Sequence, residues 1–448
     1  MLTVSEAQER VAAVVERAIK GGADAADAIY SANASTAVQV RLGDLEDVSR
    51  SEGEQIGLRV FVGRRSASVS SSDLSDDAMS LLVERVVAMA GEAPEDLWAG
   101  LAPKDRLAPG DLPEVDSDDG ADPAPADLKS RALAMEDVAR SVAGVSNSEG
   151  AAVNAGRSVN AIATSHGFCR GYTSSAYSGG VSVIAGTGGG MQRDRAYQAV
   201  RHYSDLDAPE ALGRLAGERA VARLDPRKLD SGEMPVVFDP RVGNGLLGYL
   251  IEAITGTAIT RRASFLLDRE GQRIFAPGVT IRDDPHRRRG LRSRPFDGEG
   301  LATAPTDLVT DGVLNGWLLD SASARQLGRQ PTGHAVRGGS GAPGASASNV
   351  RMEPGDSSVK ALIADVARGV YVTELIGQGV NPITGDYSRG ASGFMIENGE
   401  IGPAVAEITI AGNLLDMFGR LVPADDLEFR YSINVPTVRI DGMTIAGA

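Results

Sequence analysis

Helical and strand-like patterns alternate over the first 94 residues, and this order restricts the fold more than any other feature of the sequence. Ser5 and Gln8 form a capping pattern ahead of apolar residues at helical spacing, and Gly21 predicts the end of this helix. Segments rich in β-branched residues follow, and we predict strands at residues 27–33, 36–45, 56–63 and 66–72. Helical spacing returns over residues 73–94. This order predicts an α+β fold with a mostly antiparallel sheet.

A stretch rich in proline and acidic residues interrupts this pattern. Residues 102–126 contain five prolines and the cluster "EVDSDDGAD", so we predict an exposed connection without regular structure. Helix and hairpin patterns continue beyond it, and the strand pattern "MPVVFDP" (residues 234–240) opens a Gly-rich, strand-rich second half. We therefore expect two domains. Residues 1–230 form an N-terminal domain of helices on a mostly antiparallel sheet, and residues 231–448 form a Gly-rich, β-rich C-terminal domain.

The charge balance argues against nucleic acid and membranes as direct partners. Asp and Glu number 60 against 45 Lys and Arg, and the net charge of −15 repels phosphates and anionic headgroups. The strongest basic segment, residues 283–294, contains five arginines. Such a run is typical of a solvated loop with surface ion pairs, and binding of a peptide carboxylate or a partner is the alternative.

Cysteine content and hydropathy indicate a cytoplasmic protein. Cys169 is the only cysteine, which excludes an internal disulfide framework and fits a reducing compartment. The first residues show neither the basic segment nor the apolar segment of a secretion signal, and no apolar run is long enough to span a membrane.

The sequence contains few residues suited to metal-assisted hydrolysis. A zinc helix needs two histidines about one turn apart, but the four histidines are far apart and form no HExxH or HExxxH pair. His166 and Cys169 could supply half a zinc site, although a buried thiol and a hydrogen-bonded histidine are the commoner outcome. Glu374 and Glu407 interrupt apolar strand patterns, so each faces either water or a polar cavity. A stand-alone peptidase with an unrecognised site thus stays open as an alternative.

Several long segments resemble the TldD/PmbA family, and specifically its PmbA branch, also called TldE. They are "TGDYSRGASGFMIENGEI" (384–401), "AEITIAGNLLDMF" (406–418), "VTELIGQGVN" (372–381), "PFDGEG" (295–300) and "LDPRKL" (224–229). The resemblance extends over essentially the whole chain. It implies a two-domain α+β protein from a family whose TldD members are zinc metallopeptidases with HExxxH on a helix near the domain junction.

The resemblance also implies that this chain is the non-zinc partner. The apolar helix at residues 242–256 follows the strand at 234–240, and the zinc-helix positions fall at Leu246, Leu247 and Ile251. We therefore expect no cofactor bound by this chain, and zinc in a TldD-like partner subunit. The expected role is that of a subunit of a cytoplasmic metallopeptidase complex, acting in proteolysis or maturation of unfolded peptides, with a homodimer possible in isolation. Older family names make a modulator of DNA gyrase a less favoured alternative.

Two Gly-rich loops are the candidates for contact with peptide. Residues 333–349 predict a mobile or ligand-binding loop, and β-strand addition of an extended peptide would suit both loops. Glycine lets a backbone approach a ligand closely, and polar side chains beside it give directional contacts. The candidate peptide-binding residues are Arg337, Asp386, Tyr387, Arg389 and Ser392. The alternative is that Asp386 and Arg389 pair with each other to hold a tight turn.

Overall fold

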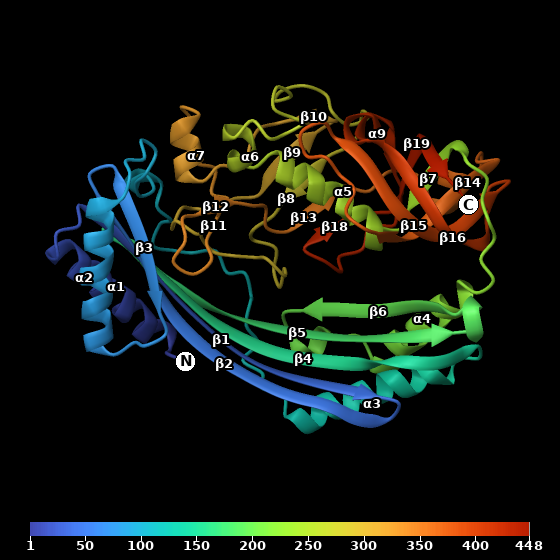
Figure 1. Ribbon diagram of the computed structural model, residues 1–448, viewed down its shortest axis with the longest axis horizontal. Coiled ribbons are helices and arrows are strands. Elements are labelled where there is room, and N and C mark those ends of the chain that lie inside the picture. Colours follow the sequence, from blue (N-terminus) through green and yellow to red (C-terminus); the bar gives the residue numbers. More distant parts are fainter. Residues whose placement is uncertain (448) are drawn as a thin grey trace.

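The computed structural model describes residues 1–447 and confirms the α+β class. Figure 1 shows a long curved sheet with helices on its convex face and the C-terminal half of the chain across its concave face. The N-terminal half contains α1 (Val4–Lys20), β1 (Ala25–Arg41), β2 (Asp44–Val62), β3 (Arg65–Ser71), α2 (Asp76–Glu92), α3 (Pro125–Ser141), β4 (Val145–Thr164), β5 (Cys169–Ala185), β6 (Gln192–Val200) and α4 (Pro209–Ala222).

The curved sheet is antiparallel throughout, in the order β3-β2-β1-β4-β5-β6. Its strands are longer than the sequence patterns predicted, because the segment at 27–33 and the first six residues of the segment at 36–45 form one strand, β1. The rest of the second segment forms the turn after β1 and the start of β2. The first half of β2 is polar and exposed, and it pairs with β1 along its length. Because these residues show no alternation of apolar and polar side chains, the sequence did not predict this part of the strand. Leu42 and Gly43 both have positive φ, and this conformation makes the tight turn between the two strands.

The capping prediction for the first helix was wrong by two residues. Thr3 is the N-cap: its hydroxyl accepts from the Glu6 backbone, and Thr3 N donates to Glu6 Oε2 at 2.7 Å. Ser5 and Gln8 have the same residue pattern but lie inside the first turn. The two patterns overlap in the sequence, so only the start of the helix distinguishes them.

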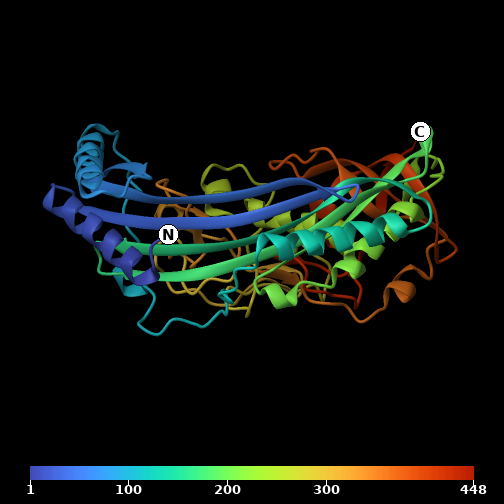
Figure 2. The ribbon, with the colours of Figure 1, turned by 90° about the horizontal axis from the view of Figure 1, so that it is seen from below.

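Four helices cover the convex face of the sheet. Figure 2 shows α1 and α2 at one end of the strands and α3 with α4 at the other. Each pair has its own buried apolar cluster, one around Val11, Leu58 and Val86 and the other around Met135, Val153 and Ala216. The sheet therefore rests on two separate cores, and its concave face is left for the C-terminal half.

The C-terminal half contains more strands than helices. Its elements are β7 (Gly232–Phe238), α5 (Pro240–Ala253), α6 (Gly256–Thr260), β8 (Ile281–Asp283), β9 (Thr306–Thr310), β10 (Val313–Leu314), α7 (Ser321–Gln326), β11 (Ala335–Val336), β12 (Gly344–Ala345), β13 (Val350–Met352), α8 (Val359–Ile363), β14 (Arg368–Ile376), β15 (Asp386–Glu397), β16 (Glu400–Asn413), α9 (Leu414–Arg420), β17 (Leu421–Pro423), β18 (Ile433–Asn434) and β19 (Val438–Ala446). Turns at Asp311-Gly312 and Asn398-Gly399 connect the antiparallel pairs β9–β10 and β15–β16, and all four residues have positive φ.

A barrel-like sheet forms the core of this half. Its strand order is β16-β15-β14-β7-β19-β17, and an additional pairing of β16 with β19 closes it. A second sheet has the order β10-β9-β8-β13-β18, and one large apolar cluster extends through both sheets and α5. Helix α5 thus packs one apolar face into the core.

The Pro-rich connection at 102–126 is not exposed along its whole length. Apart from a short 3₁₀ turn (Lys104–Arg106) and the start of α3 at its end, it has no helix, as expected. Val115 and Ser117 are buried, however, and Ser117 Oγ donates to Thr173 O of β5 at 2.8 Å. The connection runs against the sheet because the free donors and acceptors of its backbone and short side chains find partners there. None of the helices within residues 1–447 has the length and apolarity needed to cross a lipid bilayer.

Candidate functional site

Helix α5 occupies the place that the sequence marked as a degenerate zinc helix. Asp239 caps it by accepting from Arg241 N at 3.0 Å, and Pro240 begins the first turn. Leu246, Leu247 and Ile251 are 2%, 0% and 7% exposed and belong to the large apolar cluster. All three side chains therefore pack in the core.

The residues on this helix do not fit a zinc ion. Zinc takes nitrogen, sulfur or carboxylate oxygen ligands, and Leu and Ile side chains offer none. Within residues 1–447, no three His, Cys, Asp or Glu side chains converge in an arrangement that could hold a metal ion. Glu252, the one carboxylate of α5, is exposed on the far side of the helix from the core.

His166 and Cys169 each have a backbone partner. His166 Nδ1 lies 3.0 Å from Ala102 O, and the Cys169 thiol donates to Gln8 O at 3.4 Å. Burial raises the pKa of the Cys169 thiol, which disfavours the thiolate that a metal ligand or a nucleophile needs. These contacts fit the structural interpretation of the pair better than half of a zinc site.

A cleft of about 800 Å³ lies at the junction of the two halves, beside the first turns of α5. Its lining comes from β4, β5, β6 and α4 on one side and from α5, β14 and β15 on the other. Figure 1 shows β6 as the strand of the curved sheet nearest to the C-terminal half. The charged residues of the lining are Glu149, Arg193, Asp194, Arg195, Arg219, Arg223, Arg241, Glu374 and Arg389.

Buried ion pairs hold the two walls of the cleft together. Asp194 of β6 accepts from Arg241 of α5 at 2.9 Å and from Arg223, the C-cap residue of α4, at 3.4 Å. Arg223 also pairs with Glu374 of β14 across the junction. Glu374 therefore faces a polar cavity, one of the two outcomes expected for it, whereas Glu407 is exposed to water.

The candidate peptide-binding residues do not form one cluster. Arg389 lines the cleft and donates to Tyr249 Oη of α5 at 2.6 Å. Tyr387 is buried with its ring 6.3 Å from that of Tyr249, and its hydroxyl has no hydrogen-bond partner within residues 1–447. Ser392 is buried in β15, while Asp386 is exposed at the start of that strand.

Asp386 and Arg389 do not pair with each other. Asp386 accepts from Thr384 Oγ1 at 2.7 Å and from Asn413 Nδ2 at 3.3 Å, which fixes the turn before β15. Arg389 Nε instead donates to Ile376 O at 3.3 Å. The alternative in which Asp386 and Arg389 pair to hold a tight turn is therefore wrong, because each side chain has other partners.

Arg337 lies far from the cleft, in a buried ion-pair cluster between the two halves. It pairs with Asp27 of β1, and Asp27 also accepts from Arg59 Nε at 3.1 Å. The Arg337 side chain is only 1% exposed, since the predicted loop at 333–349 folds into the hairpin β11–β12 against the sheet. Burial opposes ionisation of Asp27, but the two guanidinium groups hold the pKa of its carboxyl below the ordinary value.

Two buried carboxylates, Asp297 and Glu299, lie beside this cluster. The sequence pattern did not identify either of them as a candidate functional residue. Asp297 and Glu299 belong to the "PFDGEG" segment, whose residues carried only the family resemblance. Glu299 accepts from Ser321 N at 2.9 Å and from Ser321 Oγ at 2.7 Å. Burial, and then the nearby Asp297, raise the pKa of Glu299 to about 7.

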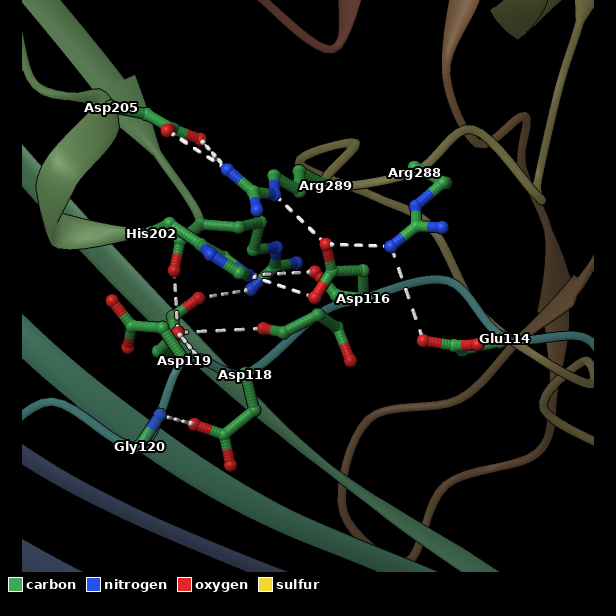
Figure 3. A network of polar contacts seen from close by, with 12 residues as sticks. Glu114, Asp116, Asp118, Asp119, Gly120, His202, Asp205, Arg288 and Arg289 are labelled. Carbon is green, nitrogen blue, oxygen red and sulfur yellow. Dashed lines mark hydrogen bonds and ion pairs between the residues drawn. The ribbon is translucent and has the colours of Figure 1, made fainter.

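The basic segment at 283–294 makes ion pairs with the acidic connection. Figure 3 shows Arg289 between Asp116 and Asp205, with Nε–Oδ2 and Nη1–Oδ1 distances of 2.8 and 3.0 Å. Arg288 donates to the same Asp116 carboxylate at 3.2 Å. For these two arginines the ion-pair interpretation is confirmed, and the pairs join the connection to the C-terminal half.

Comparisons with known proteins agree with this architecture. Family models match residues 26–90 (PmbA/TldA metallopeptidase domain 1), 118–224 (the central domain) and 231–447 (the C-terminal domain). The chain is 39% identical to metalloprotease PmbA of Escherichia coli over 98% of this chain and 96% of that protein. Its fold matches a crystal structure from Bacteroides thetaiotaomicron, described as a candidate modulator of DNA gyrase, with 27% identity, full coverage of both chains and a TM-score of 0.92.

A third relative bears on the branch within the family. The crystal structure of TldE from Thermococcus kodakarensis covers 98% of this chain and 100% of that chain, with 21% identity and a TM-score of 0.88. At that identity the match shows a shared fold, and the near full-length similarity to PmbA supplies the sequence relationship. The chain therefore belongs to the TldD/PmbA metallopeptidase family, in its PmbA/TldE branch.

Proposed function

We propose that this chain is the non-catalytic subunit of a cytoplasmic metallopeptidase complex that degrades or matures unfolded peptides. Its partner is a TldD-like subunit, which supplies zinc through an HExxxH helix. This chain contributes substrate-binding surface, cavity walls and docking contacts, and it binds no metal itself. A homodimer is possible when the chain is isolated, because a surface built for a related subunit can pair with its own copy.

One observation carries the proposal: the three zinc-helix positions are filled by buried apolar side chains. Leu246, Leu247 and Ile251 lie in the core cluster. Their side chains are hydrocarbon and contain no atom that can bind zinc. The lack of a converging set of metal-ligating side chains within residues 1–447 supports the same conclusion. The single cysteine supports a reducing compartment such as the cytoplasm.

A modulator of DNA gyrase is a weaker alternative. The description of the related Bacteroides structure favours it, but the net charge of −15 opposes contact with DNA phosphates. A DNA-binding titration at low and high salt separates the two proposals. A steep loss of binding with salt would support the alternative, whereas no binding at low salt agrees with the peptidase complex.

The experiment for the main proposal measures peptide cleavage with zinc present. The chain alone, a TldD-like subunit alone and their mixture are incubated with an unstructured peptide. We expect cleavage in the mixture and none by the chain alone. Chelator-sensitive cleavage by the purified chain alone would contradict the proposal.

A metal determination on the same samples serves as a control. The purified chain is dialysed against zinc and then against buffer, and its zinc content is measured by elemental analysis. We expect less than stoichiometric zinc, since Leu246, Leu247 and Ile251 offer no ligand atom. One tightly held zinc per chain would contradict the assignment of the metal to the partner.

A further inference from the structure

The junction cleft holds more positive charge than its own carboxylates balance. Six arginines and three carboxylates line it, in a protein whose net charge is −15. A cleft lined by one sign of charge concentrates the field and attracts ligands of the opposite sign. The overall composition is acidic, so it does not explain why arginines outnumber carboxylates in this cleft.

The three carboxylates already have ion-pair partners, and three of the arginines have no carboxylate partner, although Arg389 donates to Tyr249 Oη and to Ile376 O. Glu149 pairs with Arg193 at 3.2 Å, while the other two carboxylates hold the junction pairs described above. Within residues 1–447, Arg195, Arg219 and Arg389 enter no ion pair with a carboxylate, and each lines the cleft. Arg219 Nη1 donates only to Arg195 O, at 3.3 Å. These three guanidinium groups keep free donors for a ligand.

Two buried donors in the same cleft lack acceptors. Arg241 Nε and Thr373 Oγ1 are buried and have no hydrogen-bond partner within residues 1–447, although Arg241 Nε lies 3.5 Å from Asp239 Oδ1. Thr373 is only 5% exposed, so bulk water does not reach it freely. Buried polar groups are normally hydrogen-bonded, so a pair of unmatched donors points to an acceptor supplied by a ligand. Burial, followed by repulsion from Arg241, also lowers the pKa of Arg219.

The shape of the cleft suits an extended chain. Strand β6 is the edge of the curved sheet, pairs with β5 on one side only, and contributes Arg193, Asp194, Arg195 and Tyr197 to the lining. A free strand edge presents unpaired backbone groups that an extended peptide can match. The volume of about 800 Å³ lies within the range of ligand sites and exceeds what a single small anion needs.

We propose that the junction cleft binds an extended polypeptide segment, and that Arg195, Arg219 and Arg389 donate hydrogen bonds to carboxylates of that peptide. Guanidinium groups bind carboxylates through two parallel hydrogen bonds, so the site selects peptides rich in Asp and Glu or ending in a free carboxylate. The inference goes beyond the proposed function, because it concerns which peptides this chain prefers and holds whether or not a partner cleaves them.

Fluorescence anisotropy with labelled, unstructured peptides on the intact chain tests the proposal. One probe carries several Glu residues and an amidated end, a second replaces every Glu by Gln, and a third has the Gln sequence with a free C-terminal carboxylate. We expect the first or the third to bind at least about tenfold more tightly than the second, and the tighter of them identifies the carboxylate. Equal binding of all three overturns the proposal.

Variants place the binding in the cleft. Arg195→Gln, which alters an exposed side chain, and Arg219→Gln should each weaken binding of the carboxylate probe by roughly tenfold. Arg50→Gln is the matched control, because Arg50 is an exposed arginine outside the cleft that pairs with Glu52. Unchanged binding by Arg195→Gln, or stronger binding of a single-stranded oligonucleotide of equal charge, overturns the proposal. Circular dichroism checks that each variant is folded. If Arg219→Gln does not fold, Arg195→Gln still tests the proposal.

Discussion

Among single residues, a buried cluster of charged side chains joins the two halves of the chain. Arg337 was expected in a mobile binding loop, yet its guanidinium is buried against Asp27 between the two halves. Nothing in the local Gly-rich sequence indicates this, since the partner lies 310 positions away along the chain. A local sequence pattern cannot predict an ion pair between residues so far apart. Arg337, a candidate ligand contact, instead holds the two halves of the chain together.

Loss of the Arg337 side chain should destabilise the protein strongly. Arg337→Ala leaves Asp27 buried with only Arg59 as a partner, and breaking a buried pair costs about 3–5 kcal/mol. Urea unfolding followed by circular dichroism measures the change. The control Arg50→Ala removes an exposed pair and should cost at most about 1 kcal/mol. Equal effects of the two variants would show that the buried cluster does not stabilise the junction.

The raised pKa of Glu299 predicts a pH dependence of stability. The carboxyl titrates near 4.5 in the unfolded chain and near 7 in the folded chain, so between these values the folded state binds one more proton. Stability from this group is therefore greatest below pH 4.5 and falls as pH rises to about 7, by at most about 1.4 kcal/mol per pH unit. Glu299→Gln should flatten the melting temperature over this window.

The control for that measurement is Glu397→Gln, which alters an exposed carboxylate at the β15–β16 turn. Its melting curve should keep the pH dependence of the unaltered protein. Buried Asp297 and Arg59 also face Glu299, and both remain in each variant, so a difference between the two profiles belongs to Glu299. An unchanged profile in Glu299→Gln would contradict the assignment.

At the scale of elements, the sequence predicted the helices well and the strands less completely. Helical periodicity over residues 73–94 located α2 within a few residues, because this helix buries an apolar face. The polar start of β2 and the small residues in the middle of β1 hid the length of both strands, since their order comes from pairing with each other rather than from burial. The cleft could not be predicted at all, because its walls come from β6, α4, α5 and β14, which are distant in the sequence.

Helix α5 should behave as a packing element. Leu247→Ala removes a fully buried side chain and should cost about 2–5 kcal/mol of unfolding free energy, with no change in zinc content. Glu252→Ala, on the exposed face of the same helix, is the control and should change stability by no more than about 0.5 kcal/mol. Chemical denaturation with elemental analysis checks both quantities. A small effect of Leu247→Ala would contradict the packing role.

The whole molecule keeps the architecture of a metallopeptidase family, and helix α5, which we propose as its degenerate zinc helix, packs into the core. The family models and the near full-length similarity to PmbA fix the family. The junction cleft lies beside that helix and carries the charge that the proposed peptide ligand needs. We propose that substrate binding and catalysis are divided between two related subunits.

The most direct test of this division uses a TldD-like subunit in which the glutamate of HExxxH is replaced by glutamine. The unaltered chain is mixed with that variant, and cleavage of an unstructured peptide is measured with zinc and again with a chelator. The account predicts no cleavage, because the only zinc chemistry of the complex has been removed, while the unaltered subunit mixed with this chain remains active. Chelator-sensitive cleavage in the mixture with the variant would mean that this chain has an active site of its own, and it would contradict the account.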